Sequence, residues 1–430
     1  MPAVSAPSPV AAIEAAFARL AEWDDPACFI SLRSREDALA RARALEAEGS
    51  LGRPLYGLVF AVKDNIDVAG LSTTAACPEF SYRPHRSAFV VERLEAAGAI
   101  ALGKTNLDQF ATGLVGVRSP YGIPRNALRA DLIPGGSSSG SATSVGAGIV
   151  DFSLGTDTAG SGRIPAALNG IVGLKPSLGL FSATGMVPAC RTLDTISVFA
   201  RSVELASRVA TVAAGYDAAD AYSRELASPA LSVSSSRLRI GVPAVRYFFG
   251  DAAAEAAFAA DLKTLEARGA DLVELDFEPL HAVARLLYEG PWVAERYAAT
   301  KPLIEERPEA FHPTTLKIIG GAKGLTAVAA FEAMYKLADL KRRTCAIIES
   351  VDALAVPTLP RAYTLADLAA EPVVYNSNLG TYTNFVNLLD LAAITTPVGQ
   401  RSDGLPSSVT FIAPAGSDGR LAGYAARFGA

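Results

Sequence analysis

Short apolar runs alternate with amphipathic segments over most of this chain. Apolar runs of about four to eight residues are typical of buried strands, whereas apolar residues that recur every three or four positions indicate helices. The runs predict strands at residues 55–62, 99–102, 150–154, 238–242, 271–275, 353–356 and 393–396. The periodic segments predict helices at residues 10–23, 34–48, 87–97, 252–268, 280–305 and 325–350. Because the two kinds of element alternate, we expect an α/β protein.

The composition excludes several classes of protein. Half of the 430 residues are hydrophobic and 19% are charged, so the chain can build a large core and is not disordered throughout. The net charge is −5, and no basic surface indicates nucleic acid. No apolar run reaches the roughly 18 residues of a membrane span. The start of the chain lacks the basic and apolar stretches of a secretory signal. We therefore expect a cytoplasmic protein with no membrane and no nucleic-acid partner.

Soft metal ligands are few and scattered. They are Cys28, Cys77, Cys190, Cys345, His85, His281 and His312. No two cysteines form a C-x-x-C pair, so the sequence favours buried, reduced thiols over a zinc site. We expect neither a metal nor another cofactor.

Residues 134–190 are rich in glycine and serine, but apolar residues are interleaved throughout, which argues against a flexible linker. Gly135 and Gly140 have the spacing of a phosphate-binding loop, yet Ser141 stands where such a loop has its lysine. Residues 136–140 match the G-x-S-x-G pattern of a nucleophile elbow, but no strand leads into it. Glycines between buried apolar residues instead indicate a backbone that approaches another group closely.

A lysine at the end of an apolar run offers a different way to activate a serine. Lys63 follows the predicted strand 55–62, where its charge would be removed from water. Burial lowers the pKa of a lysine, and a neutral lysine can accept a serine proton. An ordinary lysine, with a pKa near 10.4, costs about 4.6 kcal/mol to hold neutral at pH 7. The small residues of 155–161 are suited to turning several backbone N–H groups toward the oxyanion of acyl transfer.

Several motifs in and around the glycine-rich region occur in a recognisable order. They are Gly135-Gly-Ser-Ser-Ser-Gly140, Gly155-Thr-Asp-Thr-Ala-Gly-Ser-Gly-Arg-Ile-Pro165, Gly170-Ile-Val-Gly-Leu-Lys-Pro176 and residues 62–65, 103–106, 356–360 and 396–397. With these motifs the sequence closely resembles the amidase signature family over most of residues 50–415. The resemblance implies one large α/β domain, residues 1–430, with a mixed sheet sandwiched between helices. Within it we expect a helical N-terminal segment, residues 1–50, and a signature core, residues 51–415.

The resemblance also implies a catalytic triad of two serines and a lysine. The implied nucleophile is Ser161, and the implied base is Lys63. Ser137, which follows a cis peptide in the family, is implied to relay the proton between them. Ser137 and Ser161 are 24 residues apart, the usual separation in the family.

Backbone N–H groups just before the implied nucleophile are expected to bind the oxyanion. They belong to Thr158, Ala159 and Gly160, together with Ser161 itself. Two positions depart from the family pattern, because Ala159 and Ser139 stand where glycine is commoner. Both side chains are small, so the expected role of the backbone is kept.

Two segments point to one branch of the family. Residues 105–121 and 287–297 resemble the allophanate hydrolase branch, in which a tyrosine and an arginine eight residues apart bind substrate. The matching residues are Tyr288 and Arg296, and Gly113 matches a backbone contact to substrate. A guanidinium with a phenol suits a planar anion such as allophanate, a urea that carries a carboxylate. The resemblance thus implies an allophanate hydrolase that releases ammonia in urea or s-triazine nitrogen catabolism.

Two alternatives stay open within the family. The first is another small-molecule amidase, in which Arg296 recognises a different acid. The second is an A-type subunit of a tRNA-dependent amidotransferase. A catalytically dead binding module is disfavoured because all three triad positions are filled. We expect a homodimer whose partner is a small-molecule substrate. Many members of the branch carry a further C-terminal domain, and this sequence contains only the amidase unit.

Overall fold

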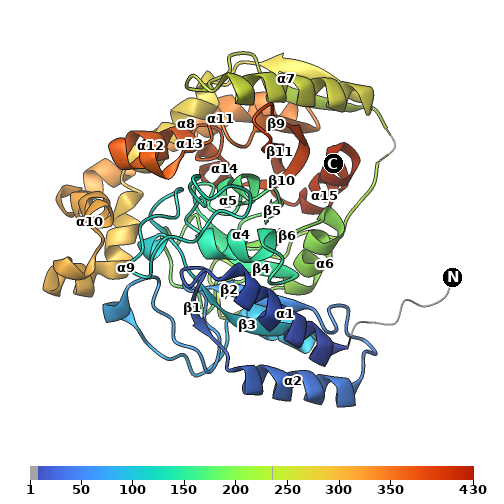
Figure 1. The fold of residues 1–430 in the computed structure, drawn as a ribbon. Coiled ribbons are helices and arrows are strands. Elements are labelled where there is room, and N and C mark those ends of the chain that lie inside the picture. Colours follow the sequence, from blue (N-terminus) through green and yellow to red (C-terminus); the bar gives the residue numbers. More distant parts are fainter. Residues whose placement is uncertain (1–7, 235) are drawn as a thin grey trace.

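A computed structural model describes residues 8–234 and 236–430 (Figure 1). Its strands are β1 (Phe29–Leu32), β2 (Val59–Lys63), β3 (Ile100–Thr105), β4 (Phe152–Asp157), β5 (Val172–Lys175), β6 (Thr195–Ala200), β7 (Leu238–Pro243), β8 (Ala270–Leu275), β9 (Ala353–Pro357), β10 (Leu391–Gln400) and β11 (Pro406–Pro414). They form one 11-stranded sheet in the order β1-β3-β2-β4-β6-β5-β10-β11-β9-β7-β8. Strand β2 runs parallel to β3 and β4, whereas β4 and β6 are antiparallel. The predicted mixed sheet is confirmed.

Helices cover both faces of this sheet. They are α1 (Pro9–Trp23), α2 (Arg35–Glu48), α3 (Phe89–Ala96), α4 (Ser139–Gly146), α5 (Ile164–Leu168), α6 (Val203–Ala213), α7 (Ala252–Ala267), α8 (Glu278–Glu289), α9 (Val293–Glu306), α10 (Pro313–Gly320), α11 (Ala327–Glu349), α12 (Leu365–Ala370), α13 (Val374–Leu379), α14 (Phe385–Leu388) and α15 (Asp418–Phe428). Helices α3, α6, α7 and α15 share one core cluster. Helices α1, α2 and α4 pack on the opposite face near the first strands, and α8, α11 and α14 near the last strands (Figure 1).

The alternation of side chains along β2 decides where Lys63 lies. Phe60 and Val62 join the core cluster under α3 and α6. Val59 and Ala61 join the cluster that contains α4. Because successive residues of a strand point to opposite faces, Lys63 points to the α4 face, where the glycine- and serine-rich segment lies.

Several sequence predictions differ from the structure in detail. The long helix predicted over residues 280–305 is two helices, α8 and α9, separated at Gly290 and Pro291, because proline cannot continue the hydrogen-bond pattern of a helix. Residues 1–50 contribute β1, which pairs with β3, in addition to the two predicted helices. The Ser- and Ala-containing residues 223–234 form no helix or strand, and Ser235 lies outside the described residues. Residues 1–7 of the predicted N-terminal segment lie outside them too.

The four cysteines are free thiols, and Cys345 alone among them is exposed. Among residues 8–234 and 236–430, no group of three or more His, Cys, Asp or Glu side chains is placed to hold a metal ion. Over the same ranges, every helix is too short or too polar to cross a membrane.

Candidate active site

The implied base, Lys63, is the last residue of β2 and is completely buried. Its Nζ lies 2.8 Å from Oγ of Ser137 and 2.7 Å from Oγ1 of Thr156. Burial lowers the pKa of Lys63 to about 7, although nearby carboxylates oppose the shift. Roughly half of the molecules therefore carry a neutral amine at this position at pH 7.

Ser137 lies just before α4, with its hydroxyl toward Lys63. The peptide bond between Gly136 and Ser137 is cis, the conformation that the family resemblance implied. The carbonyl of Ser137 accepts a hydrogen bond from the N–H of Asp108, 3.0 Å away. A Cβ atom on residue 136 would overlap Oδ2 of Asp108, so this approach has room only for glycine.

The implied nucleophile, Ser161, lies in the loop after β4 and is 3% exposed. Its Oγ is 3.5 Å from the carbonyl oxygen of Gly113, the residue matched to a substrate contact. Within the described part of the chain, no hydrogen bond joins the hydroxyls of Ser161 and Ser137. The structure therefore pairs Ser137 with Lys63, and Ser161 with Gly113.

The loop that carries the implied oxyanion donors, residues 158–161 and hereafter the oxyanion loop, is held by side chains around it. Oδ1 of Asp157 accepts a hydrogen bond from the N–H of Gly160, 2.9 Å away. The N–H of Gly160, implied as an oxyanion donor, is thus directed to this carboxylate. The N–H groups of Thr158, Ala159 and Ser161 meet no protein acceptor among the described residues. These three remain available to a substrate oxygen.

A buried ion pair fixes the end of this loop. Nε and Nη2 of Arg163 lie 2.9 Å from the two carboxylate oxygens of Asp157, and both side chains are fully enclosed. Burial alone would raise the pKa of Asp157, but the guanidinium of Arg163 holds it below its usual value. The pair links the end of β4 to the start of α5 on either side of Ser161.

We expect Arg163→Met to lower the free energy of unfolding by about 3–5 kcal/mol, because it leaves the Asp157 carboxylate buried without its partner. Urea denaturation measures this change. The matched control is Arg86→Met, whose ion pair with Glu92 lies in solvent and should contribute little. Equal stability of the two variants would contradict the structural role of the buried pair.

The two residues matched to the substrate clamp lie together. Arg296, on α9, is buried, and its guanidinium carbon is 6.0 Å from the ring centroid of Tyr288 on α8. Nη1 of Arg296 donates to the carbonyl of Ala111 and to Oγ1 of Thr112, at 3.1 and 3.2 Å. Nε and Nη2 have no hydrogen-bond acceptor among the described residues. Since Gly113 follows Thr112, the guanidinium lies next to the segment that contacts Ser161.

Asp108 shapes this same segment. Its Oδ2 accepts hydrogen bonds from the N–H groups of Val115 and Gly116, and its Oδ1 from the N–H of Arg118. The side chain of Arg118 donates to the carbonyl of Thr112 at 2.9 Å. One carboxylate thus holds the turn after Gly113 against the chain that precedes Ser137.

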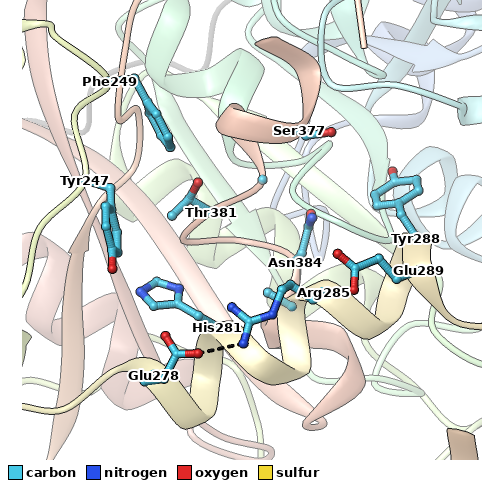
Figure 2. A pocket seen from close by; sticks show the side chains of 12 residues that line it. Tyr247, Phe249, Glu278, His281, Arg285, Tyr288, Glu289, Ser377, Thr381 and Asn384 are labelled. Carbon is cyan, nitrogen blue, oxygen red and sulfur yellow. Dashed lines mark hydrogen bonds and ion pairs between the residues drawn. The ribbon is translucent and has the colours of Figure 1, made fainter. Parts of the chain in front are cut away.

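A pocket of about 400 Å³ adjoins these residues. Figure 2 shows it between α8 and residues 377–384, with Tyr288 on one wall and Asn384 beside it. Thr383, next to Asn384, donates a hydrogen bond to the carbonyl of Ala159 at 2.6 Å. Of the residues implied by the family resemblance, Tyr288 lines this pocket, and among the described residues only Thr383 links residues 158–161 to its wall.

Sequence reasoning did not identify three polar residues of the site. Thr156 contacts the base, Asp108 holds the loop after Gly113, and Asp194 binds Thr158. Thr156 and Asp108 are completely enclosed. The sequence signal that could have identified them is a polar residue within or next to an apolar run. Thr156, two residues after the apolar run 150–154, is an example.

Comparison with known proteins gives consistent matches. The amidase family model matches residues 11–422. The urea amidolyase of Saccharomyces cerevisiae is 48% identical over 404 residues, or 93% of this chain and 22% of the yeast protein. A crystal structure of Kluyveromyces lactis allophanate hydrolase has a TM-score of 0.93 and 45% identity, over 99% of this chain and 70% of that one.

A more distant relative covers the chain equally well. A glutamyl-tRNA(Gln) amidotransferase subunit of Aromatoleum aromaticum is 34% identical over 434 residues, which cover 92% of this chain and 88% of that protein. By contrast, this chain spans only about a fifth of the length of the urea amidolyases that it matches.

Proposed function

Because the chain belongs to the amidase family, we propose that it hydrolyses allophanate and releases ammonia. The observation that carries this proposal is the buried Arg296, which lies with Tyr288 next to the segment that contacts Ser161. A guanidinium whose Nε and Nη2 donate to no acceptor among the described residues can bind the carboxylate of allophanate while the ureido carbon lies near the serine. The similarity to urea amidolyases and to allophanate hydrolase supports the same substrate.

The proposed reaction uses the three triad residues in sequence. Ser161 attacks the terminal ureido carbonyl, Ser137 takes its proton, and neutral Lys63 takes the proton of Ser137. The N–H groups of Thr158, Ala159 and Ser161 stabilise the oxyanion. The C–N bond then breaks, and the proton returns through Ser137 to the leaving nitrogen, which departs as ammonia. Water hydrolyses the acyl-enzyme by the same relay and releases an N-carboxylated carbamate, which breaks down further.

One movement completes this relay. The hydroxyl of Ser161 points to the carbonyl of Gly113, and Ser137 is already hydrogen-bonded to Lys63. We propose that a rotation about the Cα–Cβ bond of Ser161 between staggered positions turns its hydroxyl toward Ser137. We propose that substrate binding against Gly113 drives this rotation, since the substrate then replaces the contact to the Gly113 carbonyl.

Ammonia release from a panel of amides tests the proposed substrate. Allophanate should be turned over with the highest kcat/KM, and malonamate, which has a carboxylate at similar reach, should come next. Biuret, urea and a simple aliphatic amide lack the carboxylate and should be poor substrates. A preference for the aliphatic amide over allophanate would refute the proposal.

We expect Arg296→Ala to lower kcat/KM for allophanate roughly 30- to 1000-fold, because the carboxylate loses its partner in an enclosed site. This factor corresponds to a loss of about 2–4 kcal/mol of transition-state stabilisation. Part of the loss should appear in kcat, since the anchored carboxylate holds the ureido carbon at Ser161. The measurement is the ratio of kcat/KM for allophanate to that for a neutral amide.

Thr112→Val is the matched control for this variant. It removes a hydrogen bond that Arg296 makes to the loop but keeps the guanidinium, so it should affect both substrates alike. Malonate should inhibit the wild type and Thr112→Val competitively, and Arg296→Ala only weakly. An equal loss on both substrates in Arg296→Ala would show that the residue is structural.

We also propose that the protein acts as a homodimer in the cytoplasm, on allophanate formed from urea or from s-triazines. Light scattering after gel filtration should give twice the 44.6 kDa of one chain. A monomer that becomes active only with added partner subunits would favour an amidotransferase component instead.

A further inference from the structure

Asp194 connects the oxyanion loop to the segment 189–195. Its Oδ1 accepts a hydrogen bond from the hydroxyl of Thr158 and another from the N–H of Cys190, at 3.1 Å. Its Oδ2 accepts from the N–H of Ala189 at 2.6 Å. All three groups donate to the carboxylate, so the ionised form satisfies every contact, whereas a protonated carboxyl would have to reverse the hydrogen bond to the hydroxyl of Thr158 or weaken a contact to a backbone N–H.

The same segment is also tied to the helix of the substrate clamp. The N–H and the hydroxyl of Thr192 donate to the two carboxylate oxygens of Glu295, at 2.9 and 2.5 Å. Sγ of Cys190 lies 3.4 Å from the carbonyl of Trp292. Glu295 and Trp292 lie in or next to the first turn of α9, directly before Arg296. The segment 189–195 thus spans from the oxyanion loop to the substrate clamp.

We propose that Asp194 is a positioning residue that orients the oxyanion loop, and that it does so as a carboxylate through the hydroxyl of Thr158. Thr158 is the first residue of the loop, so its side chain fixes the direction in which the following N–H groups point. The other anchors are Asp157 on the N–H of Gly160 and Thr383 on the carbonyl of Ala159. Nδ2 of Asn387 also holds the carbonyl of Asp157, just before the loop, so the Asp194 contact is the one that fixes the side chain of Thr158 among the described residues.

This inference rests on the proposed serine chemistry but not on allophanate as the substrate. The loop binds the oxyanion, which exists only after the nucleophile has attacked, so loss of the anchor should lower kcat and leave ground-state binding unchanged. The expected loss is about 10- to 100-fold in kcat, less than for deletion of an oxyanion donor, because the backbone groups are displaced rather than removed.

Because Asp194 is proposed to act as a carboxylate, its protonation should change how activity depends on pH. Burial raises the pKa of Asp194 to about 6, while the hydroxyl of Thr158 and the guanidinium of Arg296 oppose that rise. The other charged or titratable groups that face it are Lys63 on β2, Glu295 on α9 and Cys190 in its own segment. As pH falls, Lys63 gains a proton near pH 7 and Asp194 gains one near pH 6.

Both protonations should reduce activity, and the further loss of about 10- to 100-fold from Asp194 should make log kcat/KM of the wild type fall with a slope steeper than one, approaching two, just below pH 6. In Asp194→Asn only Lys63 still titrates, and the slope should be one. A purely structural role would lower the whole profile and leave its slope unchanged. A slope of two in Asp194→Asn would therefore overturn the proposal.

Thr158→Val tests the link without altering the carboxylate, and so covers the case in which Asp194→Asn does not fold. Its kcat should fall about 10- to 100-fold while inhibition by malonate stays as in the wild type. Thr158→Ser keeps the hydroxyl and should recover most of this loss. The matched control is Thr184→Val, which removes a threonine hydroxyl from Asp217 away from the triad and should leave kcat unchanged.

The rate at which a fluorophosphonate labels Ser161 provides a readout that needs no amide substrate. Labelling requires the nucleophile and the oxyanion loop, so it should slow in Thr158→Val and Asp194→Asn alike. If the wild type labels rapidly but does not hydrolyse allophanate, the proposed substrate is wrong and these rates still test Asp194. Labelling of Thr158→Val within twofold of the wild type would overturn the inference.

Discussion

Ser161→Ala is expected to abolish ammonia release while the protein stays folded. The substitution removes one hydroxyl from a loop that the Asp157–Arg163 pair and Thr383 hold independently of that hydroxyl. The loss of the nucleophile should reduce kcat by about 10⁴- to 10⁶-fold. Turnover and thermal unfolding measured on the same sample separate chemistry from stability. The control is Ser144→Ala, a buried serine of α4 whose hydroxyl bonds only to the carbonyl of Ser141.

The other two members of the triad should behave as one unit with Ser161. Ser137→Ala and Lys63→Ala each interrupt the same proton path, so either change alone should cost nearly as much as both together. The double variant is the informative measurement. If its loss equalled the sum of the two single losses in free energy, the two residues would act independently and the relay would be wrong.

Lys63→Arg should be inactive, with a loss of about 10³-fold or more, because a guanidinium remains charged at every working pH and cannot accept the proton. In the wild type, activity should rise with pH through about 7, since burial places the pKa of Lys63 there and only its neutral form is a base. A pH–rate profile measures this limb. Lys263→Arg, at an exposed position, is the control and should show the wild-type profile.

Substantial turnover by Lys63→Arg would exclude lysine as the base. An acidic limb centred near 10 would instead show that the amine keeps its ordinary pKa, and that burial does not activate it.

The sequence predicted those features that depend on local pattern. Lys63 at the end of an apolar run indicated a buried amine with a lowered pKa, and the structure places it inside the sheet with a pKa of about 7. Strands β6 and β11 were missed because buried hydroxyls interrupt their apolar pattern, whereas β5 is only four residues long and contains Gly173 and Lys175. Thr410 in β11 is an example, since its hydroxyl bonds to Thr395 on β10 and to Thr358 just after β9. Such pairs make polar residues compatible with a core, and no local rule reveals them.

The details of the site depended on contacts between distant segments. The family resemblance assigned Gly160 as an oxyanion donor, but its N–H is bound by a carboxylate that is itself positioned by Arg163. Asp194 lies 36 residues from Thr158, and only the pairing of β4 with β6 brings them together. Residue type and spacing can nominate a nucleophile and a base, whereas the groups that orient them follow from the tertiary fold.

The burial of Lys63 makes the folded protein bind protons less tightly than the unfolded chain. An exposed lysine keeps its proton up to about pH 10.5, but the folded site releases it near pH 7, so unfolding takes up a proton between these values. This difference in pKa lowers the free energy of unfolding by about 5 kcal/mol below pH 7. The destabilisation disappears as pH rises toward 10.5. This residue therefore makes the protein more resistant to unfolding in mildly alkaline than in neutral solution. The rest of the core must therefore compensate for the cost of burying this lysine at neutral pH.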